Sequence, residues 1–108
     1  MSDYFEAPSP PTAPADPAAL VTACIESGAP ALLCDRGALP PEFFDLSTGL
    51  AGAMAQRLTL YEIRMAAVVP DPGAHSRAFQ DFAREADRGR WFRFFPDRER
   101  AVAWLTSG

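Results

Sequence analysis

Short, mostly apolar runs recur along the chain about every thirty residues, and each interval between them carries apolar residues at helical spacing. The runs occupy residues 31–34, 63–69 and 91–95. A run of this length bounded by Gly, Pro or Asp is typical of a buried strand. One helix between successive strands is the pattern of parallel βαβ units with right-handed crossovers. The sequence therefore predicts an α/β fold, a small single domain with a mainly parallel three- or four-stranded sheet and about four helices.

The helices are predicted from apolar periodicity and from residues that favour helix starts and stops. They are expected at about 17–27, from Asp45 or Ser47 to about Leu58, at about 76–88, and after Asp97. Gly49 and Gly52 fall inside or beside the second of these helices. A glycine weakens a helix by about 1 kcal/mol relative to alanine, so we expect this side of the helix to lie very close to another backbone.

The N-terminal region is rich in proline. Residues 7–17 hold five of the eleven prolines of the chain and almost no large apolar side chain. Proline lacks a backbone N–H and holds its predecessor in extended geometry, which excludes a packed helix or a central strand there. We expect a loop or tether at 6–15, with an edge strand or flap at Tyr4 and Phe5. The predicted organisation is a Pro-rich N-terminal segment at 1–15 and one α/β domain at 16–108.

Composition excludes several classes of function. The chain has 108 residues, 48% of them apolar, which suits one domain with its own core. A net charge of −4 gives no general attraction to nucleic acids or anionic membranes, so we expect neither as a partner. No apolar run approaches the ~20 residues that cross a bilayer, and the start of the chain lacks the basic residues of a signal peptide. These features predict a cytoplasmic protein.

Few residues carry obvious chemistry. Cys24 and Cys34 fall at apolar positions without Cys-x-x-Cys spacing, and His75 is the one histidine, so we expect no metal site and no cofactor. No phosphate-binding glycine loop or nucleophile motif occurs, which favours a protein that is not an enzyme. Parallel sheets bind ligands beyond the carboxyl ends of their strands. The predicted elements place Asp35, Asp45 and His75 at these strand ends. One hypothesis, the alternative to a protein-binding module, is therefore a small-molecule-binding protein or small enzyme with a polar pocket made by these three residues.

The segment 43–52, with the sequence FFDLSTGLAG, is the most informative stretch. It places two hydroxyls, Ser47 and Thr48, at a predicted helix start, where a phosphate would meet free backbone amides and the positive end of the helix dipole. These two residues are the candidate phosphoacceptors. The loop before them supplies a candidate partner-binding surface, formed by Glu42, Phe43, Phe44 and Asp45. A homodimer formed through an exposed sheet edge is a further possibility.

Several blocks of the sequence resemble a known bacterial family. They are LLCD at 32–35, PEFFDLSTGLAG at 41–52, RMAAVV at 64–69 and DRGR at 87–90. They are similar to the uncharacterised domain of unknown function 4180, and the likeness covers about residues 17–106. That family has no established activity, so this resemblance implies a fold and no reaction.

A more distant resemblance is to the STAS domains of anti-sigma factor antagonists. The order of elements is similar, and Asp-Leu-Ser-Thr-Gly-Leu at 45–50 stands where those regulators usually carry Asp-Ser-Ser/Thr-Gly-Leu. In those proteins a partner kinase binds this helix edge and phosphorylates the hydroxyl. The resemblance implies a STAS-like domain at 16–108, Ser47 or Thr48 as acceptor, and a kinase or other regulatory protein as partner.

Overall fold

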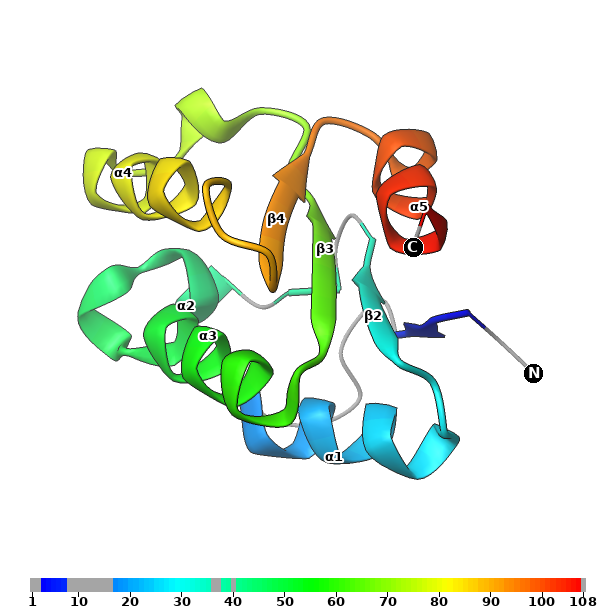
Figure 1. Ribbon diagram of the computed structural model, residues 1–108. Helices are drawn as coiled ribbons and strands as arrows, with labels where there is room; N and C mark the ends of the chain where they lie inside the picture. Colours follow the sequence, from blue (N-terminus) through cyan, green and yellow to red (C-terminus); the bar gives the residue numbers. More distant parts are fainter. Residues whose placement is uncertain (1–2, 8–16, 36–37, 40, 108) are drawn as a thin grey trace.

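Four strands lie parallel in one sheet, in the same order as along the chain. They are β1 (Phe5–Glu6), β2 (Ala31–Cys34), β3 (Arg64–Val68) and β4 (Phe92–Phe95). The computed structural model describes residues 3–7, 17–35, 38–39 and 41–107 (Figure 1). The predicted α/β fold with a parallel sheet is confirmed. The first strand comes from the N-terminal segment, where Phe5 pairs with Leu32 and the Ala7 N–H donates to the Leu33 carbonyl at 2.9 Å.

Helices cover both faces of the sheet. They are α1 (Pro17–Ser27), the short α2 (Pro41–Phe44), α3 (Leu50–Tyr61), α4 (Arg77–Ala86) and α5 (Arg98–Thr106). Right-handed crossovers between strands in sequential order place every connecting helix on the same face. Accordingly α3 and α4 lie on one side of the sheet and α5 on the other (Figure 1). Among the described residues, no helix combines the length and apolar character needed to cross a membrane.

The strand β2 is buried at all four positions because both of its faces are covered. Leu32 and Cys34 belong to the core cluster that includes α1 and α3, whereas Ala31 and Leu33 belong to the cluster beneath α5. Side chains alternate between the two faces of a strand, so each apolar residue of β2 packs into one of the two core clusters. This double burial explains why the run is continuously apolar in the sequence.

The second predicted helix begins later than expected. The sequence placed its start at Asp45 or Ser47, but residues Leu46–Thr48 form a 3-10 turn and α3 begins at Leu50. Gly49 separates the two with φ of 77°, a left-handed conformation that an α-helix cannot continue through. The expected close backbone is also wrong, because a Cβ added at Gly49 or Gly52 would meet nothing within 4 Å.

Candidate functional site

A three-residue ionic cluster lies at the carboxyl ends of the strands. Arg98 opens α5, and its guanidinium contacts Glu6 at the end of β1 and Asp35 just after β2. The two oxygens of Glu6 lie 2.7 and 2.9 Å from Arg98 Nη2 and Nη1, and Asp35 Oδ2 lies 2.8 Å from Nη1. These carboxylates raise the pKa of Arg98 above its usual value. The cluster ties the first strand, the second strand and the last helix together.

Aromatic side chains fill the space between α2, α4 and β4. Phe43 is only 2% exposed, and its ring lies 6.0 Å from that of Phe92. Phe44, in contrast, is half-buried and stacks on His75 with ring centroids 4.1 Å apart and an interplanar angle of 7°. Phe79 supports both rings of this stack from the core, at 5.0 and 5.1 Å. Phe43 is therefore a core residue, and its place in the candidate partner-binding surface is corrected. Phe44 is the member of the pair that reaches the surface.

The turn after α2 is held together by its own side chains. Asp45 Oδ1 accepts hydrogen bonds from the Ser47 N–H at 3.0 Å and from the Ser47 hydroxyl at 2.6 Å. Both bonds favour the carboxylate and lower the pKa of Asp45. Thr48 Oγ1 donates to the Asp45 carbonyl at 2.8 Å and accepts from the Leu50 N–H at 3.3 Å. The two predicted phosphoacceptors are both exposed, in a turn that precedes α3.

The other predicted site residues make separate contacts. In the alternative pocket, Asp35 binds Arg98, Asp45 binds Ser47, and His75 stacks on Phe44. Each residue of this trio therefore has its own contact in the structure, and the shared polar pocket stays a prediction. Glu42 lies in α2, and its side chain falls outside the described part of the chain. Within the described ranges, no three His, Cys, Asp or Glu side chains gather as metal ligands would.

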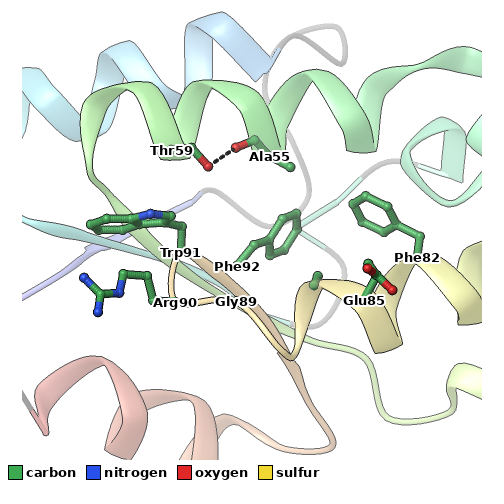
Figure 2. Close-up of a pocket in the computed structure, with 9 residues that line it drawn as sticks. Ala55, Thr59, Phe82, Glu85, Gly89, Arg90, Trp91 and Phe92 are labelled. Atoms are coloured by element: carbon green, nitrogen blue, oxygen red, sulfur yellow. Dashed lines mark hydrogen bonds between the residues drawn. The ribbon is translucent and has the colours of Figure 1, made fainter.

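A groove that the sequence did not predict opens at the other end of the sheet. It has a volume of about 240 Å³ and lies between α3, α4 and the amino end of β4. Thr59 and Ala55 of α3 face Trp91 and Phe92 across it, with Phe82 on the side of α4 (Figure 2). The apolar character of Trp91 and Phe92 predicts a strand, and no local motif marks them as the wall of a groove.

The fold and this site define a small parallel α/β domain with an ionic cluster and an aromatic surface at the carboxyl edge of its sheet. The chain belongs to the family described as Domain of unknown function (DUF4180), whose model matches residues 9–105. No curated protein and no solved structure matches it. The family that the sequence blocks indicated is confirmed, whereas the distant likeness to STAS domains stays a prediction.

Proposed function

We propose that this domain binds a regulatory partner protein through a surface formed by Phe44, Asp45, Ser47, Thr48 and His75, hereafter the Phe44 surface. The stacking of Phe44 on His75 carries this proposal. The pair is half-buried and lies beside three exposed polar residues of the Asp45–Thr48 turn. Binding energy in protein interfaces concentrates in a few aromatic anchors surrounded by a polar rim, and the Phe44 surface has this composition.

The anchor is held in place before any partner arrives. Phe43, in the same short helix, is inserted into the core, and Phe79 packs under both members of the stack. A side chain that is already fixed loses little conformational entropy on binding, which favours affinity. Burial of Phe43 therefore removes it from the contact surface but supports the role of its neighbour Phe44.

Phosphorylation at Thr48 or Ser47 is the proposed means of regulation, with a cytoplasmic kinase as the partner. Thr48 is the better placed acceptor, because its Oγ1 already accepts the N–H of Leu50, the first residue of α3. A phosphate there would lie near the positive end of that helix. Phosphorylation of either residue loses one donated bond, from Thr48 Oγ1 to the Asp45 carbonyl or from the Ser47 hydroxyl to the Asp45 carboxylate, but at Ser47 the phosphate would also face the like charge of that carboxylate.

The binding proposal is tested by affinity capture from a native lysate with paired variants. Phe44→Ala and His75→Ala each remove half of the stack, and we expect both to lose a protein that the wild-type chain retains. Leu60→Ala is the matched control, because Leu60 is 71% exposed and lies at the far end of α3. Retention of the same proteins by all four chains would contradict the proposal.

The regulatory step has its own test. Intact-mass and peptide mapping of the protein from its native host should show a phosphate on Thr48 or Ser47. Capture with Thr48→Glu and Thr48→Ala should then differ in the amount of the same partner, because the charge alters the rim of the Phe44 surface. Absence of the modification, with equal capture by the two variants, would rule out this form of regulation and leave the binding proposal standing.

The groove supports a second candidate function, the binding of a small apolar molecule. Its lining is mostly apolar and includes Trp91, whose fluorescence can report occupancy once Trp104 is replaced by Phe. Cyclohexanol is a suitable probe, and we expect a saturable change in fluorescence. Ala55→Leu, which fills the groove from α3, should abolish this change. Binding that persists in the Ala55→Leu chain would place the ligand elsewhere.

A further inference from the structure

Two arginines pack against one tryptophan on the face of the sheet covered by α5. The guanidinium carbon of Arg64 lies 4.5 Å from the ring centroid of Trp104, and that of Arg93 lies 5.4 Å from the same centroid. Each guanidinium is also held by a backbone carbonyl, since Arg64 Nη2 donates to Trp104 O and Arg93 Nε donates to Gly89 O at 3.2 Å. Both cations are therefore held against the same tryptophan by a ring contact and a hydrogen bond each.

The strand register explains why they meet. Arg64 begins β3 and lies two positions before Ala66, which pairs with Arg93 of β4. Residues two apart on a strand point to the same face, so both arginines lie on the face whose core contains Ala66 and the residues of α5. Phe44 belongs to the cluster on the opposite face, so this arginine pair is independent of the Phe44 surface.

The pair lacks a counter-charge. Among the described residues, Arg64 and Arg93 are the two arginines that are half-buried, and neither forms an ion pair there. The arginines that do pair with carboxylates, Arg84, Arg98 and Arg100, are all exposed. Partial burial of two like charges without a carboxylate is unfavourable, because desolvation and mutual repulsion both oppose it. Cation–π contact with Trp104 offsets only part of this cost.

We propose that Arg64, Arg93 and Trp104 form a binding site for a phosphate group, supplied by inorganic phosphate or by a phosphomonoester. A guanidinium has five N–H donors, and each of the two arginines uses one of them in a hydrogen bond to a backbone carbonyl. The remaining donors can bind oxyanions in the bidentate manner that arginine favours. Two positive charges match a phosphate dianion better than they match a single carboxylate, and this charge balance selects phosphate.

The site is tested by NMR titration of the full chain with inorganic phosphate and with a phosphoserine peptide, at constant ionic strength and pH. The signals of the Trp104 indole and of the Arg64 and Arg93 side chains should shift and saturate. Arg64→Gln and Arg93→Gln should each weaken binding about tenfold or more, the loss that a charge-assisted hydrogen bond gives. Arg77→Gln is the matched control, because Arg77 is exposed at the start of α4, and it should bind as the wild type does.

The titrations separate the sources and can refute the site. Tighter binding of the peptide than of inorganic phosphate identifies a phosphorylated protein as the ligand, and the reverse order identifies free phosphate. Shifts that grow linearly without saturation would overturn the proposal. Equal shifts with succinate, or unchanged affinity in Arg64→Gln and Arg93→Gln, would also overturn it, since the arginines would then only pack on Trp104 and bond to the Trp104 and Gly89 carbonyls.

Discussion

Arg98 and Glu6 are 92 positions apart in the sequence and form a bidentate ion pair, with N–O distances of 2.7 and 2.9 Å. The pair joins the start of α5 to the end of β1. Since β1 contributes only two residues to the sheet, its hold on β2 depends on few contacts, among them the bond from the Ala7 N–H to the Leu33 carbonyl. Arg98 adds an ionic contact to this short strand.

Arg98→Gln should loosen β1 with little effect on the rest of the fold. The ion pair is partly exposed and therefore screened by salt, so any loss of stability should be small and should shrink at high ionic strength. Amide hydrogen exchange at Ala7 is the sensitive measurement, and we expect it to become faster in the variant. Arg100→Gln breaks the more exposed pair with Asp97 and serves as the control. Equal exchange at Ala7 in the two variants would show that Arg98 does not hold β1.

Gly49 and Gly52 should respond in opposite directions to alanine. Gly49 has a φ of 77°, so Gly49→Ala forces a left-handed conformation on a residue with a Cβ and should destabilise the protein by about 1 kcal/mol. Gly52 lies inside α3 with open space around it, so Gly52→Ala should stabilise the protein by about 0.5–1 kcal/mol. Urea unfolding measures both. Destabilisation by Gly52→Ala would indicate a close contact at that position.

The spacing of strands and helices was sufficient to predict the parallel α/β fold, because apolar runs and helical periodicity are local signals. The start of α3 could not be predicted in this way. Ser47 and Thr48 suit the first turn of an α-helix as well as they suit a 3-10 turn, and the left-handed conformation of Gly49 decides where α3 begins. Two adjacent phenylalanines look alike in a sequence, but in α2 they point to different environments: Phe43 enters the core and Phe44 reaches the surface.

The pairing of Arg64 with Arg93 depends on long-range geometry. It follows from the register of β3 with β4 and from the position at which α5 packs on them. The residues next to Arg64 or Arg93 in the sequence predict neither the register nor the position of α5. The groove beside Trp91 has the same origin, because its walls come from two helices and a strand. Sites assembled from separate elements in this way leave no motif in the sequence.

Cys34 should make the protein less stable at alkaline pH. The residue is fully buried in β2, and burial raises its pKa far above the unfolded value of about 8.5. The neutral thiol is therefore favoured by folding below about pH 8.5, and this stabilisation is lost as the pH rises, by about 1.4 kcal/mol per pH unit for one proton. Urea unfolding from pH 7.5 to 10 should show this slope. Cys34→Ala should have a shallower slope, and an unchanged one would exclude Cys34 as its source.

Asp87 bonds to a donor of the edge strand β4, and we expect its removal to promote self-association. Its Oδ1 accepts the N–H of Phe94 at 3.0 Å, which occupies a donor on the outer side of the edge strand β4. Unpaired donors on an edge strand invite pairing with another chain. Asp87→Ala should therefore increase dimer or larger species in light scattering after size exclusion. Asp87→Asn keeps an acceptor oxygen and should resemble the wild type. If the two variants associate equally, loss of charge is responsible and the bond to Phe94 is not the protecting feature.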